Sequence, residues 1–214
     1  MSQFERLVPP GDNRERDVCR DCGHIDYQNP KVVVGAVCEF EGQVLLCRRD
    51  IEPRRGFWTI PAGYMELGET TEEGARREVR EEAEADVELT GLIGCYSIPR
   101  IGQVLLIYRG TLRDGVFAAG DETSEAKLVA YDAIEWESLA FPSVRWALED
   151  WAALQGEVSF APRSARLADV SQPLPASGPL PSSTSRATSP GDSADANGAS
   201  LSGTSSERSG TEAI

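Results

Sequence analysis

Residues 63–85 constrain this chain more than any other stretch, because eight glutamates fall within 23 residues after a glycine-rich turn. Thr70 and Glu73 have the spacing of a capping box, which predicts a helix that begins just after Thr70. An apolar residue then recurs at every fourth position, at Ala75, Val79 and Ala83. This stripe predicts that one narrow side of an otherwise acidic helix faces a core.

Two of the glutamates, Glu78 and Glu82, lie beside the apolar stripe and only about 40° apart around the helix, with Glu81 on their outer side. Like charges four residues apart destabilise an isolated helix by roughly 0.2–0.5 kcal/mol per pair, and the repulsion grows beside a core of low dielectric constant. A cation is therefore expected at this edge. Mg²⁺, or the similar Mn²⁺, is held by one or two carboxylates with phosphates and water, so a phosphate-bearing substrate is expected too.

The alternative interpretation is a solvated acidic helix whose charges pair with arginines. Arg77 and Glu81 have the four-residue spacing of such a pair, and runs of charge are commonly solvated surfaces. Spacing alone leaves both interpretations open.

The order of residues in this stretch resembles the Nudix box, G-x5-E-x7-R-E-U-x-E-E-x-G-U, in which U is apolar. The box is matched at Gly63, Glu69, Arg77, Glu78, Val79, Glu81 and Glu82. Glu84 stands where the box has its last glycine. Because glycine suits a helix C-terminus, Glu84 predicts a longer helix or an altered exit from it.

The resemblance extends over about residues 10–150, which look like the ribbon-headed Nudix hydrolases that include the plant FAD and ADP-ribose pyrophosphatases. It implies an α/β fold, the Nudix α/β/α sandwich with a mixed sheet, preceded here by a short Cys-containing arm. It also implies hydrolysis of a nucleoside diphosphate linked to another group, and a homodimer. We expect the arm at residues 1–30, the Nudix domain at 31–160, and a disordered tail rich in Ser, Pro, Gly and Ala at 161–214.

The resemblance also implies roles for individual residues. Glu78 and Glu82 match the principal metal ligands, Glu81 completes the cluster, and the carbonyl of Ala62 adds a backbone oxygen. The structural residues of the motif are Gly63, Glu69 and Arg77, of which the last two tie the preceding loop to the helix. For the general base, the leading candidates are Glu125 and Glu122, in a polar segment predicted as a loop at 118–127, with Glu81 as the alternative.

Basic residues suggest where a diphosphate binds. A basic cluster of Arg48, Arg49, Arg54 and Arg55 flanks a strand predicted at 56–61, and it either clamps a diphosphate or pairs at the surface with the acidic helix. From this cluster we take Arg48, Arg54 and Arg55 as substrate-binding candidates. Enzymes of the ADP-ribose type carry a proline about fifteen residues after the box. Pro99 lies 14 residues after Ala85, and we take Pro99 and Arg100 as further substrate-binding candidates.

The remaining periodicity predicts a mainly β domain. Apolar runs predict a hairpin at 31–49, strands at 86–98 and 104–112, a last strand at 128–134 and a helix at 144–154.

Cys19 and Cys22 have the spacing of one knuckle of a zinc ribbon. Structural zinc takes four ligands, the sequence has no second CxxC, and its single histidine, His24, is too close to Cys22 to complete a site. Ligand counting therefore disfavours zinc and favours a knuckle-shaped turn. An odd number of cysteines, without a secretory or membrane-spanning segment, predicts a reducing, cytoplasmic setting and no membrane partner.

The net charge is −14, and residues 161–214 carry four Arg against five Asp plus Glu, so −13 belongs to the folded part. Such an acidic surface argues against nucleic acid as a partner but not against a small nucleotide diphosphate that arrives with its metal. NADH, capped nucleotides and CoA remain alternative substrates. Two other function classes are a sensor that binds a nucleotide ligand without cleaving it and a nucleic-acid-binding ribbon; the acidic box and the acidic charge argue against them.

Overall fold

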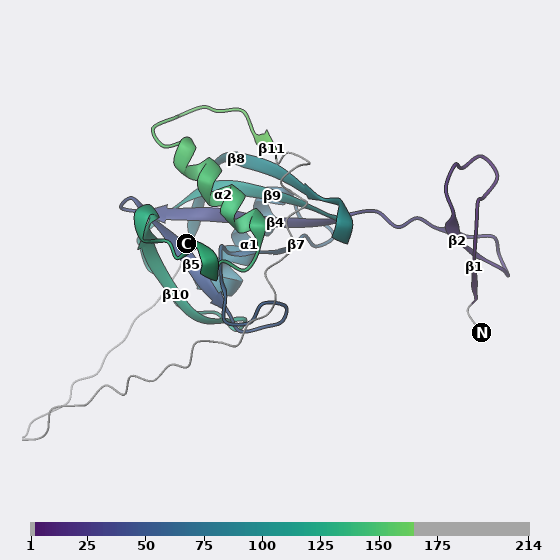
Figure 1. The fold of residues 1–214 in the computed structure, drawn as a ribbon, viewed down its shortest axis with the longest axis horizontal. Helices are drawn as coiled ribbons and strands as arrows, with labels where there is room; N and C mark the ends of the chain where they lie inside the picture. The colour runs from purple at the N-terminus through teal and green to yellow at the C-terminus, as the bar shows by residue number, and fades with distance from the viewer. Residues whose placement is uncertain (1–2, 165–214) are drawn as a thin grey trace, which may run out of the picture. The chain divides into compact units, whose positions relative to one another are not determined.

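The computed structural model describes residues 3–164, and its main body is a mixed sheet with a helix on each face (Figure 1). The strands of this sheet are β4 (Lys31–Phe40), β5 (Gln43–Arg49), β6 (Trp58–Thr59), β7 (Ala62–Tyr64), β8 (Val87–Ile98), β9 (Gln103–Leu112), β10 (Thr123–Ala130) and β11 (Arg163–Ser164). The helices are α1 (Thr71–Ala83) and α2 (Pro142–Ala153), with single 3₁₀ turns η1 (Pro99–Ile101), η2 (Tyr131–Ala133) and η3 (Trp136–Ser138). Neither α-helix among the described residues is long and apolar enough to cross a membrane.

The order of strands is β10-β5-β4-β9-β8-β11, with β6 paired to β5 and β7 paired to β4. The central pair, β4 and β9, is parallel from Lys31 opposite Gln103 to Glu39 opposite Thr111, whereas β8 and β9 are antiparallel. The prediction of a mixed sheet is therefore confirmed.

Alternation along the strands divides the interior into two cores. An α1-side core contains Val34, Ala36, Cys38, Leu45 and Cys47 with the apolar stripe of α1 (Ala75, Val79 and Ala83). An α2-side core contains Val37, Val44 and Leu46 with the apolar face of α2 (Val144, Ala147, Leu148 and Trp151). Because successive residues of a strand point to opposite faces, one apolar sheet serves both helices, and the α/β/α sandwich is confirmed.

The strand β10 corrects one prediction. We expected a loop at 118–127 and a strand at 128–134, but β10 runs from Thr123 to Ala130 and residues 131–133 form η2. The polar first half of β10 pairs with β5 from Thr123 opposite Arg49 to Ala130 opposite Gln43. An edge strand can carry exposed polar residues, so its sequence has the polar composition of a loop. Glu125 consequently lies on a strand.

The structure also corrects the prediction for the C-terminal end of α1. The helix ends at Ala83, and Glu84 takes the left-handed conformation (φ 46°) that glycine would take, while its N–H donates to the carbonyl of Arg80. Glu84 therefore neither lengthens the helix nor alters its exit. Its backbone is held in a conformation that costs a non-glycine residue roughly 1–2 kcal/mol.

The arm forms its own three-stranded antiparallel sheet of β1 (Phe4–Leu7), β2 (Arg16–Cys19) and β3 (Ile25–Asp26). The predicted disordered tail lies outside the described residues apart from residues 161–164, in which β11 pairs in parallel with Gly94 and Cys95 of β8.

Candidate active site

The N-terminus of α1 is fixed by the predicted capping box. The N–H of Glu73 donates to Thr70 Oγ1 (3.2 Å), and the N–H of Thr70 donates to Glu73 Oε2 (2.8 Å). Two N–H groups that a helix start leaves without partners are thereby satisfied. The cap sets the position at which the following turns of the helix present their carboxylates.

Arg77 fastens the loop before α1 to the helix. Its Nε and Nη2 donate to the two carboxylate oxygens of Glu69 (3.0 and 2.8 Å), and Nη2 also donates to the carbonyl of Tyr64 (3.0 Å). Hydrogen bonds from Arg77 and from the N–H of Glu66 lower the pKa of Glu69 to about 2. The structure thus brings Glu69 and Arg77 together as a pair between loop and helix.

The same guanidinium contacts two glutamates of the box. Arg77 Nη1 lies 2.7 Å from Glu78 Oε1 and 2.9 Å from Glu81 Oε2, so the four-residue pair of the solvated-helix interpretation is present. The side chain of Glu81 is 58% exposed, whereas that of Glu78 is 9% exposed. Pairing with Arg77 therefore accounts for Glu81 but leaves the burial of its neighbours to be explained.

Glu78 and Glu82 both carry buried carboxylates, and each residue as a whole is 7% exposed. Burial is the largest cause that raises the pKa of both, and for Glu82 burial and the charge of Glu78 raise the pKa to about 8. The N–H of Ala62 donates to Glu82 Oε2 (3.2 Å) and opposes part of this rise. Two buried carboxylates that repel each other are the arrangement that a bound cation relieves.

Gly63 provides the space for Glu78. A Cβ at residue 63 would lie 2.4 Å from Glu78 Oε2 and 2.6 Å from Oε1. The carboxylate of Glu78 therefore rests directly on the backbone of β7, beside Ala62, whose N–H contacts Glu82. The glycine of the motif is needed here for close approach of a side chain to the backbone.

Two residues from outside the box act on this pair. The charge of Glu122 raises the pKa of both Glu78 and Glu82, and the charge of Arg49 lowers that of Glu82. Arg49 Nε donates to the carbonyl of Pro53 (2.9 Å), and the guanidinium lies over the ring of Phe141. Arg49 belongs to the basic cluster of the sequence but was not taken from it as a substrate-binding candidate. Strand alternation could have found it, because Arg49 has the same parity as Leu45 and Cys47 of the α1-side core.

Arg48 and Glu125 lie on the other face of the sheet. Arg48 has the parity of Val44 and Leu46, which pack in the α2-side core, and Glu125 is directly opposite Arg48 in the ladder. The two side chains form an ion pair (3.7 Å). This placement separates both from the face that carries α1.

The other predicted substrate residues lie in the segment after β5 and in the turn η1. Arg55 pairs with Asp50 (2.6 Å), and the guanidinium of Arg54 lies over the ring of Phe57. Pro99 and Arg100 lie in η1, the turn between β8 and β9, which meets the start of β4 through a hydrogen bond from Lys31 N–H to the carbonyl of Gly102. No hydrogen bond or ion pair joins these four residues to Glu78 or Glu82 among the described residues.

The donor set at α1 fits a hard divalent cation. Residues 3–164 contain no cluster of three or more His, Cys, Asp or Glu side chains grouped as metal ligands. Mg²⁺ does not require one, since it binds through one or two carboxylates and fills its other positions with water and substrate phosphates. Glu78 and Glu82 offer buried oxygen donors of this kind, and the thiol of Cys47 donates to the backbone carbonyl of Glu82 (3.8 Å) rather than to either carboxylate.

The arm does not offer a complete zinc site. Cys19 and Cys22 are free thiols, and hydrogen bonds from the backbone N–H groups of Cys22 and Asp21 lower the pKa of Cys19. Gln3 lies beside this turn. Its amide donates to Asp21 (3.0 Å), and its carbonyl accepts from the N–H of Arg20 (3.0 Å). Two sulfurs do not fit the four-ligand requirement of structural zinc.

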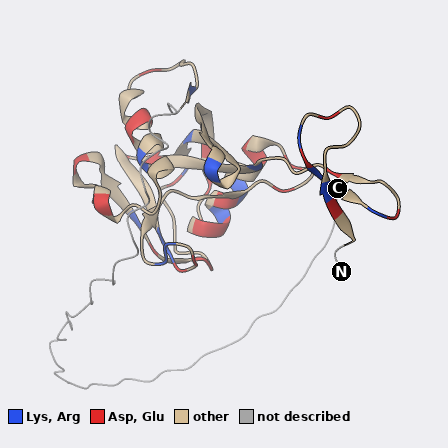
Figure 2. Cartoon of the chain, turned by 45° about the vertical axis from the view of Figure 1, so that its right-hand side comes forward, with Lys and Arg blue, Asp and Glu red and all other residues tan. Residues whose placement is uncertain are grey.

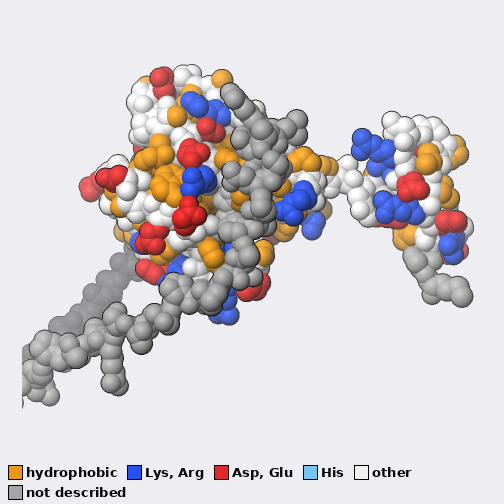
Figure 3. All heavy atoms as spheres, viewed as in Figure 1, with side chains coloured by type: hydrophobic (Ala, Val, Ile, Leu, Met, Phe, Trp, Pro, Cys, Tyr) orange, Lys and Arg blue, Asp and Glu red, His pale blue; other side chains and the backbone are white. Residues whose placement is uncertain are grey.

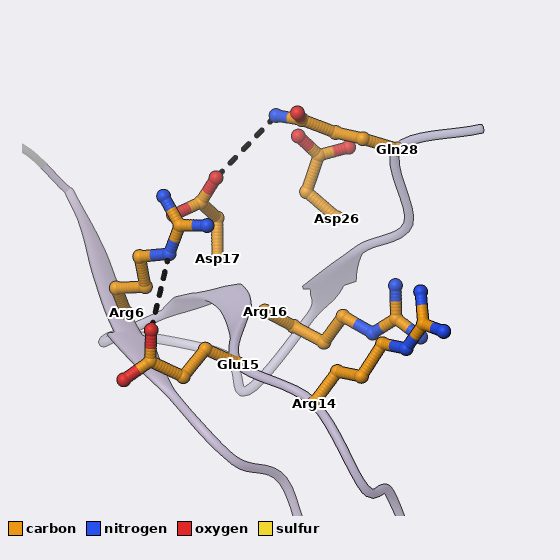
Figure 4. Close-up of a pocket in the computed structure, with 7 residues that line it drawn as sticks. All are labelled: Arg6, Arg14, Glu15, Arg16, Asp17, Asp26 and Gln28. Carbon is orange, nitrogen blue, oxygen red and sulfur yellow. Dashed lines mark hydrogen bonds and ion pairs between the residues drawn. The ribbon is translucent and has the colours of Figure 1, made fainter. Parts of the chain in front are cut away.

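The arm also carries a charged hollow of about 270 Å³, drawn in Figure 4. It is lined by Arg6, Arg14, Glu15, Arg16, Asp17, Asp26 and Gln28. Its three arginines are matched by three acids, and the ion pair between Arg6 and Glu15 (3.6 Å) closes part of it. This balance gives the hollow no preference for an anion or a cation.

Comparison with known proteins agrees with the geometry. The family model described as NUDIX domain matches residues 28–149, more than half of the chain, and the model described as Nudix N-terminal, a zinc ribbon, matches residues 2–28. The chain resembles the crystal structure of a NUDIX hydrolase from Nitrosomonas europaea with a TM-score of 0.71 and 41% identity, over 75% of this chain and 92% of that one.

Two curated relatives are named by substrate. An ADP-ribose pyrophosphatase of Methanocaldococcus jannaschii is 32% identical over 119 residues, which cover 54% of this chain and 69% of the relative. A NAD-capped RNA hydrolase of Edwardsiella ictaluri is 27% identical over 143 residues, 64% of this chain, and the match spans about half (53%) of that protein. With the box carboxylates buried beside β7 and the sandwich around them, this chain belongs to the Nudix family of hydrolases.

Proposed function

We propose that this protein hydrolyses the pyrophosphate bond of a nucleoside diphosphate linked to another group, with Mg²⁺ or Mn²⁺, and that ADP-ribose is its first candidate substrate and FAD its second. The observation that carries the proposal is the pair of buried carboxylates, Glu78 and Glu82, against the backbone of Ala62 and Gly63. A buried pair of like charges is costly unless a ligand uses it.

Glu78 and Glu82 are the side chains that would hold the metal, with Glu81 at the solvent side and the backbone of Ala62 beside them. When bound, the metal would neutralise charge on the diphosphate and lower the pKa of the attacking water. The neighbouring Arg49 would bind a phosphate oxygen once the charge of Glu82 is engaged, because its guanidinium already lies within electrostatic reach of that carboxylate.

Glu122 is the proposed general base. Its charge acts on both buried carboxylates, whereas Glu125 is paired with Arg48 on the opposite face of the sheet. Glu122 is also exposed, so water can reach its carboxylate. A carboxylate that is not itself a ligand can accept the proton of the water. Glu81 remains the alternative base.

The substrate assignment has support from relatives. ADP-ribose is named in the relative from Methanocaldococcus jannaschii, and a NAD-linked substrate in the one from Edwardsiella ictaluri. Both names describe nucleoside diphosphates with a second group attached, which is the class proposed here. FAD rests on the resemblance of the sequence to ribbon-headed pyrophosphatases.

We further propose that the protein is cytoplasmic, that it forms a homodimer and that its partner is a small nucleotide. All five cysteines, which lie within the described residues, are free thiols, as expected in a reducing compartment. On the uncovered part of the face in Figure 3, Lys and Arg side chains are interspersed with Asp and Glu. A surface of this kind does not favour a nucleic-acid backbone.

The test is a substrate panel of ADP-ribose, FAD, NADH, CoA and ADP-glucose, with Mg²⁺, with Mn²⁺ and with EDTA, in which nucleoside monophosphate products are separated by chromatography. We expect one compound to be cleaved fastest, only with metal, and to yield AMP. Binding of a compound without cleavage under any metal condition would instead identify a ligand sensor.

A further inference from the structure

The loop at residues 113–122, between β9 and β10, is held on the C-terminal end of α1. The N–H of Ala118 donates to the carbonyl of Ala83 (2.9 Å), and the N–H of Gly120 donates to the carbonyl of Glu82 (3.1 Å). The last carbonyls of a helix have no partner within the helix. This loop supplies partners at the end of α1 that carries Glu82.

Gly120 touches the helix backbone so closely that no side chain fits. A Cβ at residue 120 would lie 1.8 Å from the carbonyl oxygen of Glu81 and 2.8 Å from its carbonyl carbon. These are backbone atoms of a packed helix, which cannot move aside as the end of a flexible side chain can. Glycine is therefore required here for space rather than for an unusual backbone conformation.

From Gly120 the chain makes a four-residue turn that ends in the sheet. The N–H of Thr123 donates to the carbonyl of Gly120 (3.0 Å), and Thr123 is buried directly opposite Arg49. Within this turn, the carbonyl of Glu122 accepts from the N–H of Asp50 (2.8 Å). The backbone of Glu122 is thus held by Asp50, the residue after β5, two residues beyond the contact of Gly120 with α1.

We propose that Gly120 is a positioning residue, whose contact with α1 holds the carboxylate of Glu122 beside Glu78 and Glu82. This inference rests on the proposed function, in which Glu122 accepts the proton of the attacking water. The loop belongs to neither the box nor the helix, so it provides a way to connect a residue 40 positions further along the chain to the carboxylates of α1.

The experiment compares Gly120→Ala, Glu122→Gln and the double variant, with Asp121→Asn as the matched control, since Asp121 is an exposed carboxylate of the same turn. Turnover on the substrate found by the panel gives kcat and KM, and calorimetry gives the affinity for Mg²⁺. Because displacement of a catalytic group by about 1 Å costs roughly 100-fold, we expect kcat of Gly120→Ala to fall about that much, with KM changed far less.

The double variant separates positioning from a general structural role. If Gly120 acts through Glu122, the double variant is as slow as Glu122→Gln and no slower, and its Mg²⁺ affinity matches as well. Both single variants should weaken Mg²⁺ by roughly tenfold, because each removes or displaces one nearby negative charge. Multiplied effects of the two substitutions on kcat or on Mg²⁺ affinity would overturn the proposal, as would wild-type values for Glu122→Gln.

A second variant covers the case in which Gly120→Ala does not fold. Ala118→Pro removes the N–H that bonds to Ala83 and leaves Gly120 itself unchanged. It should show the same fall in kcat and in Mg²⁺ affinity, again not additive with Glu122→Gln. If wild-type protein cleaves nothing in the panel, the proposed function fails, and the Mg²⁺ affinities alone still decide whether Gly120 acts through Glu122.

Discussion

Glu82 couples the stability of the metal-free protein to pH. Its folded pKa, about 8, lies above the ordinary value of 4.5 because the carboxyl is buried near Glu78. Between these two values the folded state binds more protons than the unfolded state, so the free energy of unfolding falls as pH rises. The protein keeps this contribution below pH 4.5 and loses it progressively up to about pH 8.

Glu82→Gln is therefore expected to stabilise the metal-free protein at pH 8 relative to wild type, with little difference at pH 5. Glutamine keeps the shape and can still accept the hydrogen bond from Ala62. Thermal unfolding in EDTA at the two pH values measures this, with Glu84→Gln, an exposed position on the same helix end, as the control. Equal melting temperatures of wild type and Glu82→Gln at pH 8 would contradict the burial of that charge.

Replacement of Glu84 by glycine is expected to stabilise the protein. Glycine adopts the left-handed conformation at φ 46° without the strain that a Cβ introduces, although it also loses more entropy on folding. We expect Glu84→Gly to raise the free energy of unfolding by roughly 0.5–1 kcal/mol. Urea denaturation measures the change, and Glu84→Ala, which keeps the strain, should show no such gain. A loss of stability in Glu84→Gly would show that the glutamate side chain itself contributes.

Single residues were predictable where chemistry required a fixed spacing and not where the sheet decides. The spacing of the box placed Glu78 and Glu82 on one edge of a helix, and the structure buries both. Arg49 was predicted as part of the basic cluster, but Arg48 was chosen from it as a candidate because the two neighbouring arginines look identical in sequence. Only the parity of β5 shows which of the two faces α1.

Among the elements, the helix α1 was predictable from local sequence alone, because a capping box marks its start and an apolar stripe runs along it. The start of β10 was not predictable, because it depends on long-range pairing with β5, and the polar residues there give no strand pattern in the sequence. As a result, Glu125 was expected on the same loop as Glu122, whereas strand geometry turns Glu125 towards Arg48.

The N-terminal cap of α1 provides a prediction for an element. Thr70→Ala removes the side-chain acceptor for the N–H of Glu73 and is expected to cost about 1 kcal/mol of stability. Thr70→Ser, which keeps a hydroxyl acceptor at the cap, is the control. Urea denaturation of both variants measures the difference, and an unchanged midpoint for Thr70→Ala would show that the cap contributes nothing.

The arm is expected to keep its three strands without zinc, because Cys19 and Cys22 supply only two sulfurs, whereas strand pairing and the hydrogen bonds of Gln3 to Asp21 and Arg20 hold the arm together. Purified protein should contain far less than one zinc per chain, and Cys19→Ser with Cys22→Ser should leave the amide NMR signals of β1 and β2 dispersed. One zinc per chain by mass spectrometry would refute this, and one zinc per two chains would point to a site completed by a second copy.

At the scale of the whole molecule, the sandwich follows from strands that are apolar on both faces. Val34 and Ala36 pack towards α1 while Val37 packs towards α2, so β4 reads as a continuous apolar run and is covered on both sides. The acidic charge is spread over the elements of the domain (Figure 2) rather than confined to the site. Sequence therefore predicted the layers, while the partners of each charged side chain required the structure.

We expect hydrolysis by this protein to depend on the buried carboxylates of α1, Glu78 and Glu82. The most direct measurement is kcat/KM for the best substrate of the panel, with Mg²⁺ and with EDTA, for wild type, Glu82→Gln and the control Glu84→Gln. We predict activity only with metal, a fall of roughly 100- to 1,000-fold for Glu82→Gln, and a change of less than about twofold for the control. Metal-independent cleavage, or an equal loss of kcat/KM in both variants, would contradict the role of these carboxylates in hydrolysis.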